Sequence, residues 1–285
     1  MPVPLPSVPG VRHGDVDLPT GVRLHVAEAG DAGAPPLLLV HGWPEHWWAW
    51  RDVIPALAQR HRVIAPDLRG LGWSGQPADG DFAKERLADD IIALLDALGV
   101  ERAGYLGHDW GAWTGYLVAM RAPERLTRLM TVAMLHPWAA RLPTVRNAWR
   151  LAYQLPVAAP VLGPALLRDG RALRVVLTRL IGPGPAAVYS EVLREPERAA
   201  ASSALYRAFQ LRELPAILAG RYAGARLEVP VKLLFPRGDG AQRTSQLPGL
   251  EGRVPELDVE VVEGNHFLPE GRPELVAERA LAWFG

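Results

Sequence analysis

The stretch Tyr105-Leu106-Gly107-His108-Asp109-Trp110-Gly111-Ala112 decides the fold of this chain. A short apolar run ends at Gly107, and a helical pattern begins directly after Asp109. The small residues Gly107, Gly111 and Ala112 let a strand turn sharply into a helix without steric collision. The residue at the apex of such a turn is exposed above the sheet, at the positive end of the helix, where a carboxylate is favoured. The apex residue here is Asp109.

The identity of the apex residue limits the chemistry that the turn can support. Serine hydrolases place a hydroxyl at this position, whereas a carboxylate can displace a leaving group from saturated carbon and become an ester. Asp109 therefore favours an epoxide or an alkyl halide over an ordinary ester as substrate. The alternative is that Asp109 only caps the following helix, since aspartate is common at helix N-caps.

The composition fits one large α/β domain with an inserted subdomain, because 285 residues with 49% apolar content can bury a large core. Lysine and arginine together number 31, as do aspartate and glutamate, so the net charge is zero. We therefore expect neither nucleic acid nor a membrane as partner, and a small neutral ligand. The oligomeric state is expected to be a monomer or a homodimer.

Cysteine is absent from the sequence, which excludes disulfides, thiol catalysis and zinc sites built on cysteine. The first ten residues are rich in proline and lack the basic start and apolar run of a signal peptide. No apolar window approaches the length of a membrane span. We expect a cytoplasmic protein.

Strand and helix patterns alternate along the chain, which predicts an α/β fold with a mostly parallel sheet and helices on both faces. The first two strands should form an antiparallel hairpin at a sheet edge. The expected strands are 14–18, 22–28, 37–40, 62–65, 103–106, 129–135, 231–235 and 257–262. The expected helices are 47–59, 82–98, the helix from the turn to Met120, and 273–284.

This alternation is interrupted after His136 by a long stretch with helical patterns, several prolines and no clear strand. We expect residues 1–136 and 227–285 to form the two parts of an α/β core, and residues 137–226 to be inserted as a helical cap. Open α/β sheets bind ligands in the crevice at the carboxyl ends of their strands. A cap over that crevice would act as a lid.

A nucleophilic carboxylate needs a base that activates water to hydrolyse the ester it forms. After the turn the chain holds two histidines, His136 and His266. His266 lies in a loop between the last expected strand and the last helix, from which it can reach the crevice. His136 precedes a proline at the start of the insertion, which suits a structural role better. We therefore interpret His266 as the base.

The base in turn needs a carboxylate that fixes its tautomer and stabilises its charged form. Asp239 follows the strand before the histidine loop, which gives the chain order Asp109, Asp239, His266. Asp258 is the nearest alternative, but it lies within an alternating strand where it would point to solvent. Asp239 could also be an ordinary turn residue beside two glycines, and its place after a strand favours the catalytic interpretation.

Hydrolysis of the ester places negative charge on an oxygen, which backbone amides can stabilise by roughly 3 kcal/mol per preorganised donor. The amide of Trp110, directly after the nucleophile, is one candidate donor. The amide of Trp43 is the second, because its loop follows a buried strand and Gly42 permits close backbone approach. The alternative for that loop is a plain turn containing proline.

These residues stand in four motifs that run in order along nearly the whole chain. The motifs are His41-Gly42-Trp43-Pro44-Glu45 with Trp50-Arg51, Asp67-Leu68-Arg69-Gly70-Leu71-Gly72-Trp73-Ser74, Gly107-His108-Asp109-Trp110-Gly111, and Gly264-Asn265-His266-Phe267. Together they resemble the α/β-hydrolase superfamily and, within it, the soluble epoxide hydrolases with an aspartate nucleophile. The resemblance implies Asp109 as nucleophile, His266 with Asp239 as the pair that activates water, and a helical cap. It also implies the amides of Trp43 and Trp110 as oxyanion hole, and neither cofactor nor metal.

Epoxide hydrolases usually also place two cap tyrosines over the epoxide oxygen, where a phenol can donate a proton as the ring opens. Tyr206 resembles the second of these. Counting back from Gln154 puts Trp149 at the place of the first, with Tyr153 one helical turn further along. Either Tyr206 acts largely alone or Tyr153 takes the place of the first tyrosine. Trp149, Tyr153 and Trp110 are the expected substrate-binding residues.

The function expected from this resemblance is hydrolysis of a hydrophobic epoxide to a vicinal diol through an alkyl ester on Asp109. The alternative is a haloalkane dehalogenase, in which the indoles of Trp110 and Trp149 would hold the halide, or a haloacetate dehalogenase. The first commonly has asparagine where this chain has Trp43, and the second usually has arginine where it has Trp110. A ligand receptor on the same scaffold is disfavoured, because binding alone does not require nucleophile, acid and base together.

Overall fold

An eight-stranded, mostly parallel sheet forms the centre of the computed structural model, which describes residues 3–285. The strands are β1 (Arg12–Asp17), β2 (Arg23–Ala29), β3 (Pro36–Val40), β4 (Arg62–Pro66), β5 (Ala103–His108), β6 (Leu126–Val132), β7 (Val231–Pro236) and β8 (Leu257–Val262). Their order across the sheet is β1-β2-β4-β3-β5-β6-β7-β8. The pairs β1–β2 and β2–β4 are antiparallel and the others are parallel. The expected hairpin and sheet are thus confirmed.

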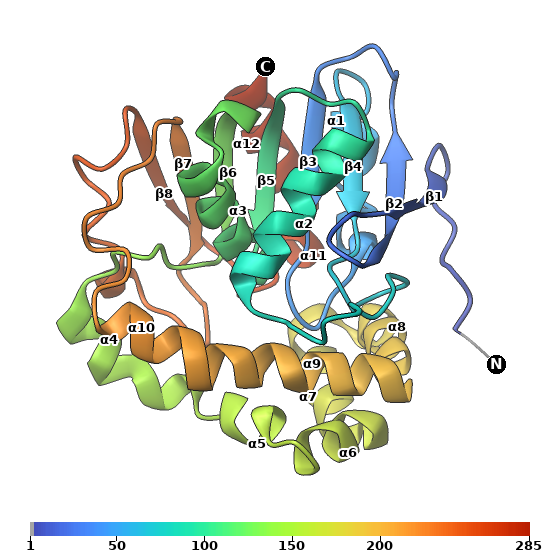
Figure 1. Cartoon of the computed structure of the whole chain (residues 1–285), viewed down its shortest axis with the longest axis vertical. Helices are drawn as coiled ribbons and strands as arrows, with labels where there is room; N and C mark the ends of the chain where they lie inside the picture. The colour runs from blue at the N-terminus through green and yellow to red at the C-terminus, as the bar shows by residue number, and fades with distance from the viewer. Residues whose placement is uncertain (1–2) are drawn as a thin grey trace.

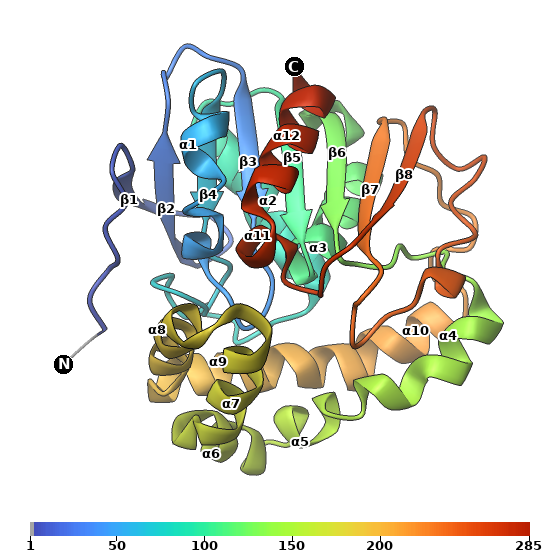
Figure 2. The ribbon, with the colours of Figure 1, turned by 180° about the vertical axis from the view of Figure 1, so that it is seen from behind.

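Two layers of helices cover the sheet. Helices α2 (Lys84–Ala97) and α3 (Trp110–Arg121) lie on the face toward the viewer in Figure 1. Helices α1 (Ile54–Leu57) and α12 (Pro273–Phe284) lie on the other face, with the short α11 (Leu268–Gly271) nearby (Figure 2). Alternate residues of β3 supply the two cores, since Leu38 packs in the α2 and α3 layer while Leu39 packs in the α12 layer.

The expectation of a single helix over residues 47–59 is wrong. The chain instead forms a 3₁₀ turn, η1 (Trp47–Trp50), followed by the one-turn helix α1. Pro55 stands in the first turn of α1, where its missing amide is tolerated. The same missing amide prevents a continuous helix from running through this position.

Between β6 and β7 the described chain forms helices and no strand, all inside residues 137–226, for which we keep the name cap. The helices are α4 (Arg141–Asn147), α5 (Gln154–Ala158), α6 (Leu162–Asp169), α7 (Arg171–Ile181), α8 (Pro183–Leu193), α9 (Pro196–Ala208) and α10 (Leu214–Leu218). The 3₁₀ turn η3 (Ala148–Leu151) precedes α5, and the π-helical turn η4 (Phe209–Glu213) follows α9. In both views α9 runs beneath the carboxyl ends of the strands, α5 and α6 lie on its far side, and α4 lies beside α10 (Figures 1 and 2).

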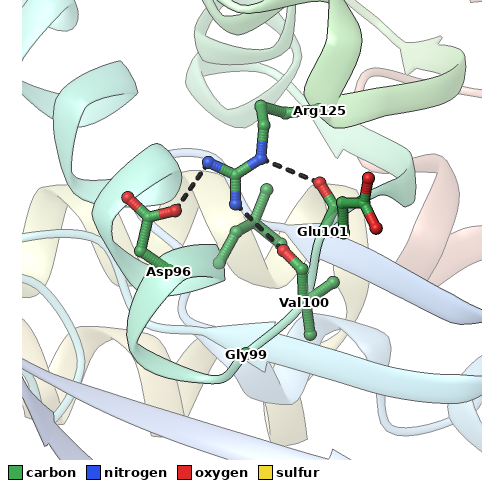
Figure 3. Close-up of a pocket in the computed structure, with 6 residues that line it drawn as sticks. Asp96, Gly99, Val100, Glu101 and Arg125 are labelled. Atoms are coloured by element: carbon green, nitrogen blue, oxygen red, sulfur yellow. Dashed lines mark hydrogen bonds and ion pairs between the residues drawn. The ribbon is translucent and has the colours of Figure 1, made fainter.

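The short 3₁₀ turns η2 (Pro123–Arg125) and η5 (Thr244–Gln246) complete the core. A shallow cavity of about 290 Å³ lies beside Arg125, between the end of α2 and the start of β5. The guanidinium of Arg125 connects the end of α2 to the start of β5 (Figure 3). It donates hydrogen bonds to Asp96 Oδ1 at 2.7 Å and to the carbonyl oxygens of Glu101 and Val100 at 2.8 and 2.9 Å. This corner lies at the amino ends of the strands, opposite to the end where ligands bind in such sheets.

Candidate active site

The sharp turn between β5 and α3 has the geometry that its small residues predict. Asp109 adopts φ 49° and ψ −121°, a strained conformation for a residue with a side chain. A Cβ atom on Gly107 would stand 2.7 Å from Ala112 Cα, and one on Gly111 would stand 2.1 Å from the carbonyl oxygen of Val40. Only glycine fits at these two positions, which holds Asp109 at the apex.

The nucleophile, acid and base expected from the sequence are brought together at the carboxyl ends of neighbouring strands. Asp109 follows β5, Asp239 follows β7, and His266 follows β8. His266 Nδ1 lies 2.8 Å from Asp239 Oδ2, and His266 Nε2 lies 3.3 Å from Asp109 Oδ2. The imidazole thus stands between two carboxylates, with a nitrogen directed at each.

Asp239 is held firmly enough to orient this histidine. Its side chain is fully buried, and its Oδ1 accepts hydrogen bonds from the amides of Ala241 and Gln242 at 2.7 and 2.9 Å. The other oxygen, Oδ2, is left for His266. The alternative acid, Asp258, is half exposed on β8 and forms an ion pair with Lys232. The geometry therefore places Asp239, and not Asp258, beside the base.

Mutual electrostatics shift the three pKa values in a coherent way. Burial would raise the pKa of Asp109, but its hydrogen bond and ion pair with His266 outweigh burial and lower it. Burial would also raise the pKa of Asp239, but the charge of His266 and its hydrogen bond to Asp239 outweigh burial and lower that pKa. Burial would lower the pKa of His266, but Asp239 and Asp109 raise it well above its usual value. In the resting site an imidazolium is therefore favoured between two ionised carboxylates.

One of the two expected oxyanion donors already contacts the expected nucleophile, Asp109. The amide of Trp43 donates to Asp109 Oδ1 at 3.0 Å. This contact requires glycine at position 42, because a Cβ there would lie 2.3 Å from Asp109 Cβ. The amide of Trp110 lies in the first turn of α3, where helix amides lack backbone acceptors. Within residues 3–285 it makes no hydrogen bond to Asp109, so it remains available for a second oxygen.

The cap presents two tyrosines to this cluster. Tyr206 of α9 is buried, and its ring meets those of Trp43 and Trp110 edge-on at centroid distances of 5.0 and 5.8 Å. The ring of Tyr153 stands 6.3 Å from that of Tyr206. For both hydroxyls burial, reinforced by nearby negative charge including that of Asp109, raises the pKa. Both phenols therefore keep their protons near neutral pH.

Trp149, in contrast, does not reach the cluster. It is 67% exposed, and its ring packs against the guanidinium of Arg150 at 4.6 Å. The expectation that Trp149 occupies the first cap position is corrected by this geometry. Tyr153, placed at the start of α5 after the 3₁₀ turn η3, stands there instead.

A model of the α/β-hydrolase fold family matches residues 35–271. The chain belongs to the α/β-hydrolase fold family. This α/β-hydrolase is 44% identical over 115 residues to the soluble epoxide hydrolase of Corynebacterium sp. strain C12, covering 40% of this chain and 39% of that protein. It is 52% identical over 94 residues to epoxide hydrolase A of Mycobacterium tuberculosis, covering 32% of this chain and 29% of that protein. The chain thus aligns with about a third of the length of these two relatives.

A solved structure extends the comparison to the whole molecule. The epoxide hydrolase CorEH shares 30% sequence identity with this α/β-hydrolase at a TM-score of 0.80, covering 96% of this chain and 98% of that chain. Cfl2 from Burkholderia cenocepacia shares 29% identity at a TM-score of 0.83, covering 97% and 96% of the two chains. The resemblance to epoxide hydrolases expected from the motifs is confirmed.

Sequence reasoning missed a buried pair of residues, Glu45 and His108, beside the cluster of Asp109, Asp239 and His266 in this α/β-hydrolase. His108 Nδ1 lies 2.6 Å from Glu45 Oε2, and His108 Nε2 donates to the carbonyl oxygen of His266 at 2.9 Å. Glu45 and His108 both lie inside the motifs quoted above, and His108 directly precedes Asp109. Their position in these motifs could have indicated that they form this buried pair. His136, by comparison, lies outside the cluster and binds the carbonyl of Leu247 at 2.6 Å.

A second missed feature is a buried lysine that links core and cap. Lys84 Nζ donates to the carbonyl of Leu205 at 2.7 Å, lies 3.7 Å from Glu213 Oε1, and stands 4.4 Å from the centroid of the Trp110 ring. Burial lowers its pKa to about 8, against the attraction of Glu213 and Asp109. No motif signals this contact, because Lys84 opens a helix where a lysine ordinarily faces solvent.

Proposed function

We propose that this α/β-hydrolase is an epoxide hydrolase that converts a hydrophobic epoxide and water to a vicinal diol through an ester on Asp109. The observation that carries the proposal is the cluster of one carboxylate, one imidazole and two phenols. The carboxylate of Asp109 faces the imidazole of His266 at 3.3 Å. The ring of Tyr206 meets that of Trp110, the residue directly after Asp109, and the ring of Tyr153 meets that of Tyr206. A hydrophobic substrate fits the aromatic surroundings of Trp110, whose ring packs 4.8 Å from that of Phe209.

In the first step an oxygen of Asp109 attacks an epoxide carbon and the carbon–oxygen bond of the ring breaks. The ring oxygen takes a proton from Tyr206 or Tyr153, which leaves a hydroxyalkyl ester on Asp109 and a tyrosinate. The lowered pKa of Asp109 keeps the nucleophile ionised for this attack. The raised pKa values of the two phenols keep the donors protonated.

Ester formation then prepares the second step by itself. It removes the negative charge of Asp109, which is one of the causes of the raised pKa of His266. That pKa therefore falls, the imidazolium releases its proton to solvent, and the neutral imidazole can act as a base. His266, oriented by Asp239, takes a proton from water, and the hydroxide attacks Asp109 Cγ. The amides of Trp43 and Trp110 stabilise the oxyanion, and the diol leaves with the proton of His266. The regenerated carboxylic acid of Asp109 returns its proton to the tyrosinate, and His266 takes a proton from solvent, which restores the resting site.

The dehalogenase alternative draws less support from the same geometry. A halide would need two indole N–H donors, and the expected second donor, Trp149, is 67% exposed. A haloacetate would need a cation after the nucleophile, where this chain has Trp110. The two phenols have a task only when an epoxide oxygen must be protonated.

Single-turnover hydrolysis in heavy-oxygen water tests the proposal, with enzyme in excess over a styrene-oxide-like epoxide. The first diol should be mainly unlabelled while the label enters Asp109, because the oxygen given to the diol comes from that carboxylate. Asp109→Ala should form no diol, and the matched variant Asp258→Ala should retain turnover. Fully labelled diol in the first turnover would exclude the ester, and bromide release from a bromoalkane without diol formation would favour the dehalogenase.

A further inference from the structure

The cap exposes far more apolar side chain than the core does. Of the fifteen large apolar residues that are exposed in residues 3–285, thirteen lie between Leu142 and Leu218, and only Leu5 and Val259 lie elsewhere. The most exposed of these side chains are Val161 at 83%, Leu211 at 70%, Leu142 at 69% and Trp149 at 67%. Scattered exposed apolar residues are normal, whereas a concentration in one region marks an interaction surface.

Most of these side chains belong to the helices farthest from the sheet. Helices α5 and α6 lie on the side of α9 away from the core, and α4 lies beside α10 at one end of the cap (Figures 1 and 2). We name the exposed side chains of residues 141–181 the outer cap surface. The inward faces of α6 and α7 already have apolar packing through the buried residues Leu167 and Leu177. The exposed apolar residues therefore exceed what packing within the cap requires.

The same surface is strongly basic. Residues 141–181 carry seven arginines and a single acidic residue, Asp169. Asp169 pairs with Arg171 at 3.3 Å, and five exposed arginines have no carboxylate within ion-pair distance among the described residues. These five are Arg141, Arg146, Arg168, Arg174 and Arg179. The whole cap holds thirteen arginines and five acidic residues, a net charge of +8, which leaves the remainder of the chain at −8.

This charge distribution argues against a second copy of the chain as the occupant. A two-fold symmetric dimer through the outer cap surface would set arginines against arginines with one acidic residue from each side. Contact of the cap with the acidic core of another copy would be heterologous, and such contacts form rings or open filaments rather than two-fold symmetric dimers. Helices that combine exposed apolar residues with arginines are instead typical of surfaces that lie in the interface of an anionic membrane.

We propose that the outer cap surface docks on an anionic lipid surface. The apolar side chains of α4 to α7 enter the boundary between headgroups and acyl chains, and the unpaired arginines bind lipid phosphates and carboxylates. Tyr153 lies in this layer, half exposed between Trp149 and Leu155, while its ring reaches Tyr206 of the candidate site. This proposal differs from the expectation of no membrane partner, which used a net charge of zero that averages a basic cap with an acidic core.

Vesicle flotation tests the docking with the whole chain. The protein should float with vesicles of phosphatidylcholine and phosphatidylserine, weakly with phosphatidylcholine alone, and less as salt is added. Arg146→Gln, Arg174→Gln and Arg179→Gln combined should lower partitioning by about 10²-fold, at about five-fold per arginine. The matched control combines Arg12→Gln, Arg60→Gln and Arg237→Gln, which removes equal charge from exposed positions on the core and should leave partitioning unchanged. Absence of flotation, or equal losses in both triple variants, overturns the proposal.

Trp149 supplies an independent readout, since the other nine tryptophans are buried or partly buried. Brominated lipid should quench tryptophan emission on docking, and Trp149→Phe should remove most of that quenching. Quenching that persists in Trp149→Phe places another face against the lipid and contradicts the proposal.

Sedimentation velocity without vesicles tests whether a second copy of the chain occupies this surface instead. A dimer that dissociates in the Val161→Gln and Leu162→Gln variant would make the outer cap surface a subunit interface and contradict the proposal. Diol formation by the Arg146, Arg174 and Arg179 variant should stay unchanged, which separates this test from that of the proposed function.

Discussion

The candidate site joins two regions that are held in different ways. On the core side, hydrogen bonds and ion pairs fix Asp109, His266 and Asp239, and each contact involves a buried partner. On the cap side, Tyr206 is held by the ring edges of Trp43 and Trp110, and Tyr153 is 46% exposed. Charged groups need defined geometry to act, whereas rings tolerate small shifts. Changes on the core side should therefore abolish turnover, and changes on the cap side should only reduce it.

The largest effect is expected from the base. His266→Gln should lower steady-state turnover on the order of 10⁵-fold, since loss of the base costs more than loss of the orienting acid in related triads. Asp109 should still react once, so that the ester accumulates and is detected as added mass on the intact protein. The matched control is His136→Gln, which changes the other histidine after the turn and should keep normal turnover. Normal turnover of His266→Gln would remove its assigned role.

The next largest effect is expected from the acid. Asp239→Asn keeps the shape of the side chain but loses the charge that raises the pKa of His266 and fixes its tautomer. Turnover should fall on the order of 10⁴-fold. Asp258→Asn tests the nearest alternative acid and should have little effect, because that side chain pairs with Lys232 on the outer strand. Comparable losses of turnover in both variants would contradict the assignment.

The cap tyrosines should show intermediate effects. Tyr206→Phe should slow ring opening by about 10²-fold, and Tyr153→Phe by less, because in each variant the other phenol can still donate a proton. The double variant should lose more than either single one. Stopped-flow measurement of ester formation reports this step directly, through the emission of the tryptophans that touch Tyr206. An unchanged rate in the double variant would exclude phenol catalysis.

The pH dependence should separate the two steps. Burial alone would lower the pKa of His266, and of the two carboxylates that raise it, Asp109 loses its charge in the ester. The base then titrates at a lower pH than in the resting enzyme, and hydrolysis of the ester should fall about tenfold per pH unit below that pKa. Alkylation should persist to lower pH, since the pKa of Asp109 is lowered. Ester should therefore accumulate as pH falls; a first step that fails before the second would contradict this order.

The difference between the two regions also explains what the sequence could predict. Asp109, Asp239 and His266 each follow a strand, and parallel strands bring their carboxyl ends to one edge of a sheet, so chain order alone indicated their meeting. Gly42 and Gly107 marked the close approaches of backbone around them. The core side of the site could thus be interpreted from local patterns.

Local sequence patterns could not predict which residues of the cap face the candidate site. Counting back from Gln154 to the usual position of the first cap tyrosine placed Trp149 over the site. The chain forms the 3₁₀ turn η3 there, with three residues per turn instead of the 3.6 of an α-helix. The change of helical type turns Trp149 outward and leaves Tyr153 beside Tyr206. Lys84 was missed for a related reason, because only the position of the cap decides that it is buried.

The smallest effect on turnover is expected from a substitution of Trp149, which the 3₁₀ turn η3 directs away from the site. Trp149→Phe should leave the turnover of a soluble epoxide about unchanged, because the side chain is 67% exposed and packs on Arg150 rather than on the reacting groups. Tyr153→Phe, four residues away, should reduce it. Steady-state diol formation by the two variants, measured in parallel without lipid, decides between them. A loss in Trp149→Phe equal to that in Tyr153→Phe would mean that the cap rearranges during turnover to bring the indole over Asp109.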